Sequence, residues 1–290
     1  MPSMENSFQA KTLVEALPYI KRFSGQTLVI KYGGSIVSQE NVVESLANDI
    51  ALLRFVGIKP VIVHGGGGII EKWLKRFGKE QRIIDGQPFI DAEALEIIDM
   101  VLTGNVSNFI VSSLTQSGVK ALGLSGRDAQ IFTTRRIKYS PKKDLGYMGE
   151  IESTDVTLIN KLIADNYVPV ISSVGLSRDG TILNVESDFV AAVLASHLKA
   201  TKLIYLSSHS GINWGDSLLD FLDLPQLEEI IKSKKLDVSL AYKLQAALAA
   251  LKGGVKDVHV ISGITEHAVL LEVFTDRGIG TMITNQKMKI

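Results

Sequence analysis

Hydrophobic positions along the chain follow two spacings. Seven short, mostly apolar runs, several of them rich in β-branched residues, have the length of buried strands: residues 27–32, 61–64, 119–124, 167–172, 202–206, 258–261 and 269–274. Four longer segments repeat apolar residues at helical spacing: residues 42–53, 92–114, 188–198 and 239–251. Strands that alternate with amphipathic helices are typical of a parallel sheet covered on both faces. We therefore predict an α/β fold, an open and mostly parallel sheet sandwiched by helices.

Two segments depart from this alternation. Residues 130–153 are predicted to form a β-hairpin with a polar, Lys-rich tip that would overhang a site. Residues 8–23 precede the first strand and are predicted to form an amphipathic helix with Pro18 inside it. We divide the chain into an N-terminal helix at residues 1–24, a first lobe at 25–166 and a second lobe at 167–290.

Composition narrows the class of protein. The 290 residues are 46% hydrophobic, which is enough for a large core, and 31 basic residues balance 31 acidic ones. A net charge of zero gives no basic field to hold nucleic acid. The absence of cysteine excludes disulfides and Cys-type zinc sites. The apolar runs are strand-sized and the N-terminus lacks a secretory h-region. We expect a cytoplasmic protein with neither nucleic-acid nor membrane partners.

Glycines cluster after the first two predicted strands. Gly33 and Gly34 follow Lys31, and a run of four glycines occupies residues 65–68. The carboxyl ends of strands are where open α/β sheets bind ligands, and glycine there lets backbone amides approach an anion. Neither cluster has P-loop or G-x-G-x-x-G spacing. The pattern favours a phosphate chain between two amide loops, with at least one of residues 65–68 at positive φ; ordinary strand-to-helix turns are the alternative.

An ordered set of motifs resembles the N-acetylglutamate kinases along nearly the whole chain. The set comprises residues 31–35 (KYGGS), 64–67 (HGGG), 126–128 (GRD), 184–188 (NVESD), Lys243, and a tail with His267, Glu272, Gly278, Gly280 and Thr281. The resemblance implies an amino-acid kinase fold. It also implies that residues 25–166 bind the acyl-amino acid and residues 167–290 bind the nucleotide.

The resemblance implies a reaction and the residues that carry it. The reaction is the ATP-dependent phosphorylation of the side-chain carboxylate of N-acetyl-L-glutamate in arginine biosynthesis, with Mg²⁺ on the ATP phosphates. The implied catalytic residues are Lys31, Lys243 and the Asp188 that holds their ammonium groups. The implied ligand-binding residues are Gly33 and Gly34 for phosphate, and Gly65, Gly66, Gly67 and Asn184 for the substrate. No residue is assigned to hold a metal directly.

The N-terminal segment resembles the extra helix of arginine-inhibited, hexameric members. This implies that residues 1–24 are an oligomerisation helix in a homo-hexamer, built as a trimer of dimers. The apolar positions that would serve this are Phe8, Leu13, Leu17 and Ile20. The implied site for L-arginine as an inhibitor comprises Tyr19, His259, Glu272 and Gly278. A helix that caps its own lobe is the alternative.

Four places depart from the pattern. Pro88 stands where the family has an arginine that grips a substrate carboxylate, and Glu186 stands where it often has asparagine. Residues 238–243 (VSLAYK) replace a glycine-rich loop, and residues 206–208 (LSS) lack an acidic residue. The catalytic charges remain while contacts that select substrate change. Two alternatives to acetylglutamate kinase therefore stay open: a divergent kinase with another substrate, and a non-catalytic protein that senses arginine or nucleotide.

Overall fold

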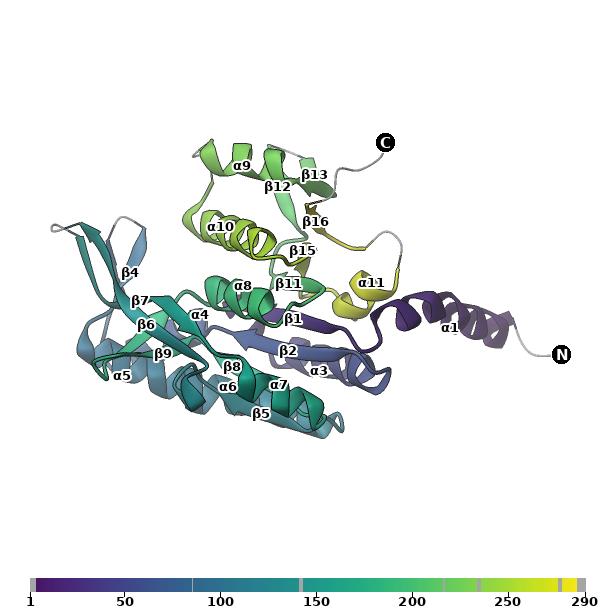
Figure 1. Ribbon diagram of the computed structural model, residues 1–290, viewed down its shortest axis with the longest axis horizontal. Helices are drawn as coiled ribbons and strands as arrows, with labels where there is room; N and C mark the ends of the chain where they lie inside the picture. Colours follow the sequence, from purple (N-terminus) through teal and green to yellow (C-terminus); the bar gives the residue numbers. More distant parts are fainter. Residues whose placement is uncertain are drawn as a thin grey trace.

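An eight-stranded sheet runs through the protein in the computed structural model, which describes residues 4–84, 86–140, 143–215, 217–233, 236–275 and 278–285 (Figure 1). The strand order is β14-β16-β15-β11-β1-β2-β8-β5. The strands are β1 (Thr27–Tyr32), β2 (Lys59–His64), β5 (Ala121–Leu124), β8 (Val168–Ser172), β11 (Lys202–Ser207), β14 (Phe221–Asp223), β15 (Asp257–Ser262) and β16 (Thr281–Thr284). Neighbouring strands from β15 to β5 are parallel, and β16 runs antiparallel to β15. The predicted α/β fold is confirmed.

Helices cover both faces of this sheet. One face carries α7 (Thr157–Ala164), α8 (Ser187–His197), α9 (Leu224–Lys232) and α10 (Val238–Lys252); the other carries α3 (Glu40–Phe55), α6 (Ser107–Gln116) and α11 (Ala268–Phe274). Successive residues of β1 join opposite cores, Val29 on the first face and Leu28 and Ile30 on the second. This is why the central strands read as mostly apolar runs and not as an alternation of apolar and polar residues.

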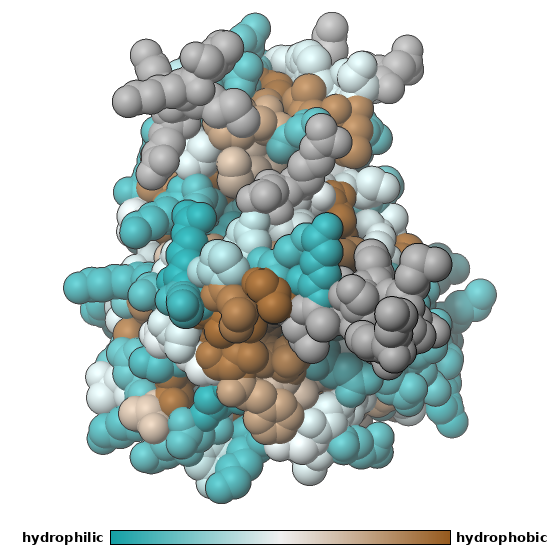
Figure 2. Space-filling model, turned by 90° about the vertical axis from the view of Figure 1, so that its right-hand side faces the viewer, coloured by the Kyte–Doolittle hydropathy of each residue, from teal (hydrophilic) through white to brown (hydrophobic). Residues whose placement is uncertain are grey.

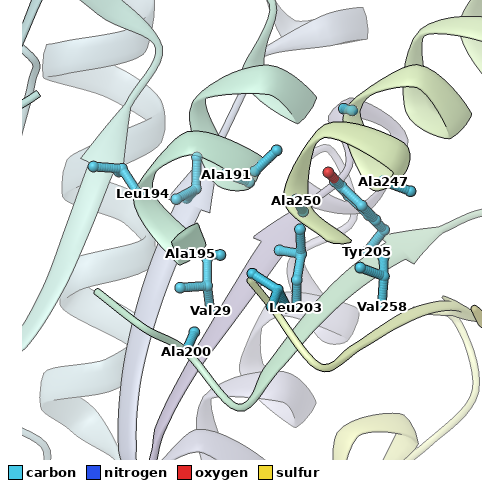
Figure 3. Close-up of a cluster of buried hydrophobic side chains, with 14 of the residues drawn as sticks. Val29, Ala191, Leu194, Ala195, Ala200, Leu203, Tyr205, Ala247, Ala250 and Val258 are labelled. Atoms are coloured by element: carbon cyan, nitrogen blue, oxygen red, sulfur yellow. The ribbon is translucent and has the colours of Figure 1, made fainter. Parts of the chain in front are cut away.

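Small residues let α8 and α10 approach the sheet closely. Ala191 and Ala195 of α8 and Ala250 of α10 pack near Val29 and Leu203 of the sheet, all of them buried (Figure 3). Because alanine has no side chain beyond Cβ, the helix backbones sit low over the strands. The N-terminus of α8 and the first turns of α10 are thereby fixed above the carboxyl ends of β1 and β11.

A four-stranded closed barrel lies beside the main sheet. Its strands are β6 (Phe132–Ser140), β7 (Lys143–Thr154), β9 (Val174–Ser177) and β10 (Ile182–Val185). The antiparallel pairing of β6 with β7 confirms the predicted hairpin, whose tip includes residues outside the described ranges. Since β8 of the second predicted lobe pairs with β2 and β5 of the first, the sheet is continuous across residue 167. The lobe boundaries stay a prediction.

Shorter elements connect these layers. They are α2 (Gly34–Val37), α4 (Gly67–Arg76), β3 (Arg82–Ile84), β4 (Gln87–Phe89), β12 (Ile212–Trp214), β13 (Ser217–Leu219) and a 3-10 turn, Asp128–Gln130. The predicted long helix is α5 (Ala92–Asp99), a π-helical segment (Met100–Val106) and α6 in succession. Of the described residues, this stretch alone is long and apolar enough to cross a membrane, but half of its most apolar window is buried inside the protein. It packs on α3 and β5 as a core helix does.

The N-terminal helix α1 (Met4–Phe23) projects from the body (Figure 1). Phe23 at its end is buried in the core, whereas Val14 and Leu17 are exposed. The side chains of Phe8 and Leu13 lie outside the described residues. Figure 2 views the face from which this helix projects and shows apolar surface gathered in the middle of it, between hydrophilic margins.

The prediction of a strand at residues 269–274 is wrong, because these residues form α11. A six-residue, mostly apolar run is compatible with either structure, and spacing alone does not separate them. Tertiary contacts decide: the buried Asp49 carboxylate accepts hydrogen bonds from His267 and from the backbone N–H of Val269, which anchors the start of a helix. Val269 and Val273 then face the core at a spacing of four.

Candidate active site

A cavity of about 400 Å³ opens at the carboxyl ends of β1, β2 and β11. Both glycine loops line it, as do residues 184–188 and Lys243. A larger cavity of about 910 Å³ adjoins it and shares Ser207, His209, Ser239 and Lys243 with it. Trp214 and Asp237 line only the larger one. The pair of cavities offers room for two ligands that meet at Lys243.

Asp188 joins the two lysines that the sequence singles out. Its Oδ1 lies 2.7 Å from Lys31 Nζ and its Oδ2 lies 3.1 Å from Lys243 Nζ. All three side chains are buried. Burial alone would raise the pKa of Asp188, but Lys243 and Lys31 hold that pKa at about 2. The structure therefore brings Lys31, Asp188 and Lys243 together as predicted, from β1, α8 and α10.

Burial also acts on Lys243. It lowers the pKa of this ammonium, and the Asp188 carboxylate opposes that shift. Asp188 lies in the first turn of α8, where the helix dipole favours a negative charge. The arrangement holds two positive charges in a low-dielectric cavity, where they interact strongly with a phosphate.

Tyr205 supports this cluster, and its role was missed in the sequence. Its phenol donates a hydrogen bond of 3.0 Å to the backbone oxygen of Asp188, and Lys243 Nζ lies 5.1 Å from the centre of its ring. The side chain is fully buried and points up between α8 and α10 (Figure 3). A tyrosine inside a buried strand needs a partner for its hydroxyl, and this was the signal available in the sequence.

The two glycine loops pack backbone against backbone. A Cβ atom added to Gly34 would lie 2.7 Å from the Cα of Gly67, and one added to Gly67 would lie 2.8 Å from the Cα of Gly34. Gly67 has φ +30°, which confirms the prediction of a positive φ in residues 65–68. The amides at the start of α4 have no side-chain cap. Since these amides line the cavity, they are placed to bind an anion.

The substrate positions predicted from the sequence line the same cavity. Gly65, Gly66 and Asn184 lie on its wall, and Pro88 lies on it too. Glu186 is the residue before α8, makes no side-chain capping hydrogen bond there, and is half-buried. Burial, and then the neighbouring Asp188, raise the pKa of Glu186. His64, below the glycine loop, is neutral because burial lowers its pKa to about 4.

The predicted effector residues fall near α11, away from this cavity. His259 Nδ1 lies 2.5 Å from Glu272 Oε1, and Gly278 packs against the Glu272 carboxylate. Tyr19 of α1 packs on the core cluster to which Val269 and Val273 of α11 belong. Lys202, which the sequence did not single out, donates to His259 Nε2 at 2.7 Å. Because burial lowers the pKa of His259, a neutral ring links the lysine to the glutamate.

Comparison with known proteins places these features in a family. The profile of the Amino acid kinase family matches residues 26–262. The acetylglutamate kinase of Ruthia magnifica is 41% identical over 94% of each chain, and that of Nitrosospira multiformis is 43% identical over 98% of this chain and 99% of its own.

A solved structure resembles nearly all of this chain. The N-acetylglutamate synthase of Neisseria gonorrhoeae, complexed with coenzyme A and N-acetyl-glutamate, has a TM-score of 0.86 at 27% identity. The match covers 96% of this chain but 64% of the synthase, so the chain spans a little under two thirds of that protein. The same synthase complexed with L-arginine gives 0.83 at 25% identity. With a family match over most of its length, the chain belongs to the amino acid kinase family.

Proposed function

We propose that the protein transfers the γ-phosphoryl group of ATP to the side-chain carboxylate of N-acetyl-L-glutamate. The observation that carries this is the bridge from Lys31 through Asp188 to Lys243, at the mouth of two facing amide loops. The names of the relatives support it, since proteins called acetylglutamate kinase share 41% to 43% identity over nearly the full chain. This activity belongs to the synthesis of arginine.

The two cavities suit the two substrates of the proposed reaction. The acyl-glutamate lies against residues 65–67 and Asn184, and the nucleotide lies in the larger cavity. An oxygen of the ionised carboxylate attacks the γ-phosphorus as the bond to the ADP oxygen breaks, so no proton needs to be removed. Lys31, Lys243 and the amides of Gly33 and Gly34 stabilise the charge that spreads over the phosphoryl oxygens.

Magnesium would bind at this site together with the nucleotide and not through a set of protein ligands. Among the described residues no group of three His, Cys, Asp or Glu side chains could hold a metal ion. Asp188 already accepts from both lysines. The ATP phosphates would therefore be the main ligands of Mg²⁺, which neutralises part of the phosphate charge.

Release of ADP in the presence of acetylglutamate and Mg²⁺-ATP tests the proposal. We expect release that depends on acetylglutamate and falls about a hundredfold or more in Lys243→Met, because the buried ammonium is lost. Lys252→Met is the matched control, since Lys252 lies on the same helix but pairs with Glu228 at the surface. Nucleotide binding without any transfer would contradict the proposal and favour a sensing protein.

We also propose that α1 assembles the protein into a homo-hexamer, a trimer of dimers, in the cytoplasm. Val14 and Leu17 are exposed on a helix that projects from the body. Burying them against a second subunit would remove apolar surface from water. Deleting residues 1–22 should give a smaller assembly by light scattering, and Leu17→Asp should do the same without shortening the chain. A full-length monomer would contradict this.

L-arginine is proposed as an inhibitor that binds between α1 and α11. Glu272 is a buried carboxylate beside Gly278, and a carboxylate is the natural partner of a guanidinium group. We expect arginine to lower the rate of ADP release in the wild type and to lose this effect in Glu272→Gln. Inhibition that is equal in the two proteins would place the arginine elsewhere.

A further inference from the structure

His64 is a buried titratable residue that the proposed reaction does not use. It is the last residue of β2, directly before the glycines at residues 65–68, and its side chain is fully buried. Because side chains alternate along a strand, its ring faces the same side of the sheet as Ile62, which packs in the core beneath α3 and α6. Burial lowers the pKa of His64 to about 4, so the ring is neutral at physiological pH.

One contact defines which ring nitrogen of His64 carries the proton. Its Nδ1 lies 3.2 Å from the backbone oxygen of Gly65. Because a carbonyl oxygen accepts hydrogen bonds and cannot donate them, Nδ1 of the neutral ring carries the proton and donates to Gly65. Nε2 is then an acceptor, and no described residue donates a hydrogen bond to it.

This arrangement does not favour stability on its own. A buried acceptor without a donor costs free energy, and an apolar side chain of similar size would avoid that cost. At the positions that pair with His64, Tyr32 of β1 and Ser172 of β8 also have buried hydroxyl groups without partners among the described residues. A costly buried group at the base of a ligand site is expected where function requires that group.

The contact with Gly65 also orients the next backbone amide. The peptide bond between Gly65 and Gly66 is trans, so its C=O and N–H groups point in opposite directions. Since the buried ring holds the C=O group, the N–H group of Gly66 points away from the ring. Gly66 lines the smaller cavity, and its N–H donates to no backbone acceptor in the described part of the chain. This N–H is therefore available to a ligand.

We infer that His64 is a positioning residue for the acceptor substrate: through the carbonyl group of Gly65, it aims the N–H of Gly66 at an oxygen of the bound acyl-glutamate. The inference rests on the proposed function, in which the acyl-glutamate lies against residues 65–67. His64 itself contacts no ligand, and its Nδ1 proton stays on the ring throughout the reaction. The ring acts by fixing one peptide unit before the substrate arrives.

Two substitutions of His64 separate positioning from packing. His64→Asn places a side-chain NH₂ group near the position of Nδ1 and keeps a donor for Gly65, whereas His64→Leu fills the space without a donor. Ser172→Ala is the matched control, because it removes a fully buried polar group at the paired position and leaves the contact with Gly65 intact. Calorimetry on the full-length proteins measures two dissociation constants, that of ADP with Mg²⁺ and that of N-acetyl-L-glutamate in their presence.

We expect acetylglutamate to bind about tenfold or more weakly to His64→Leu than to the wild type, because a hydrogen bond to a charged oxygen is misaligned. His64→Asn and Ser172→Ala should bind it within about threefold of the wild type. ADP should bind equally to all four proteins. An unchanged affinity for acetylglutamate in His64→Leu overturns the inference. So does an equally large loss in His64→Asn or Ser172→Ala, or a loss of ADP binding in His64→Leu.

Magnetic resonance of the histidine rings gives a second readout that needs no folded leucine variant. The wild type is labelled with nitrogen-15 in its histidines, and the His64 signals are assigned by their absence from His64→Asn. Near neutral pH, we expect a neutral ring with its proton on Nδ1. A proton on Nε2 alone would overturn the inference, because Nδ1 could then not donate to Gly65.

The outcomes separate this inference from the proposed function. If His64→Leu weakens acetylglutamate binding as expected but the wild type transfers no phosphoryl group to it, the proposed function fails and the role of His64 stands. If the wild type phosphorylates acetylglutamate and His64→Leu binds it equally well, the function stands and the role of His64 fails. A wild type that does not bind acetylglutamate overturns both.

Discussion

Replacing Asp188 with asparagine is expected to disable phosphoryl transfer while leaving the nucleotide able to bind. The substitution keeps the side-chain shape and removes the charge that Lys31 and Lys243 share, at 2.7 and 3.1 Å. Two buried ammonium groups would then face each other without a counter-charge. Since burial already lowers the pKa of Lys243 and Asp188 opposes this, the variant's Lys243 should lose its proton at a lower pH.

The magnitude follows from these distances. At an effective dielectric of about 20, each contact is worth roughly 5 to 6 kcal/mol before the cost of desolvating the ions. Most of that attraction is offset by burial, and removing one partner of a buried pair typically costs about 3–5 kcal/mol. For a chain of this size the melting temperature should fall by on the order of 10 °C. We expect kcat to fall by about a hundredfold or more, because misplaced or neutral lysines no longer stabilise the phosphoryl oxygens.

Two measurements check this together. Thermal unfolding with and without Mg²⁺-ATP should show that nucleotide recovers part of the lost stability, because phosphate supplies the missing negative charge. ADP release as a function of pH should show residual activity that declines as pH rises, when the variant's Lys243 becomes neutral. A kcat within about threefold of the wild type would refute the reasoning, since the bridging charge would then be unnecessary.

Three further outcomes test other parts of the structure. Gly67→Ala should abolish activity, because its Cβ would lie 2.8 Å from backbone, whereas Gly68→Ala meets nothing within 4 Å and should keep activity; equal rates in the two variants would contradict this. Pro88→Arg should tighten acetylglutamate binding about tenfold or more by calorimetry, because it adds a cation to the wall of the smaller cavity. Unchanged binding would contradict the expectation that a cation at position 88 contacts the substrate. His267→Asn should destabilise the protein more at pH 6 than at pH 8.5. The hydrogen bond to Asp49 raises the pKa of His267. The positive charge of His267 therefore stabilises the fold fully below about pH 6.5, and this stabilisation is lost as pH rises through the raised pKa. Equal destabilisation at the two pH values in chemical unfolding would exclude a role for that charge.

The central fold could be predicted from sequence because strands that are buried on both faces appear in the sequence as short, mostly apolar runs. β1 and β2 are buried at every residue after the first, so each reads as a short, mostly apolar run, in which Lys31 and His64 are the buried polar residues. The glycine loops could be predicted for a related reason. The close approach of Gly34 and Gly67 admits no Cβ, and four glycines in succession have little other use.

The contacts that could not be predicted depend on residues distant in the chain. Residues 268–274 form a helix because of Asp49, more than two hundred positions earlier. Strands β9 and β10 are four residues each, and they are stabilised by closing a barrel with β6 and β7. Lys202 and Tyr205 both read as ordinary residues of a strand, the first at its start and the second inside it. Their partners, His259 and Asp188, are defined only once α8 and β15 pack beside β11.

The transfer machinery and the acceptor wall are built from different parts of the fold, so one can change without the other. Asp188, Lys31 and Lys243 are fixed by the packing of α8 and α10 on the central strands, and Tyr205 holds them from below. Pro88 lies in the short hairpin of β3 and β4, outside that core. A substitution at Pro88 therefore alters what binds without disturbing the charges that transfer phosphate. Glu186 is the exception, since it precedes Asp188 by two residues and shares its electrostatic field. A change of charge at Glu186 should therefore alter the electrostatic field at the residues that transfer phosphate.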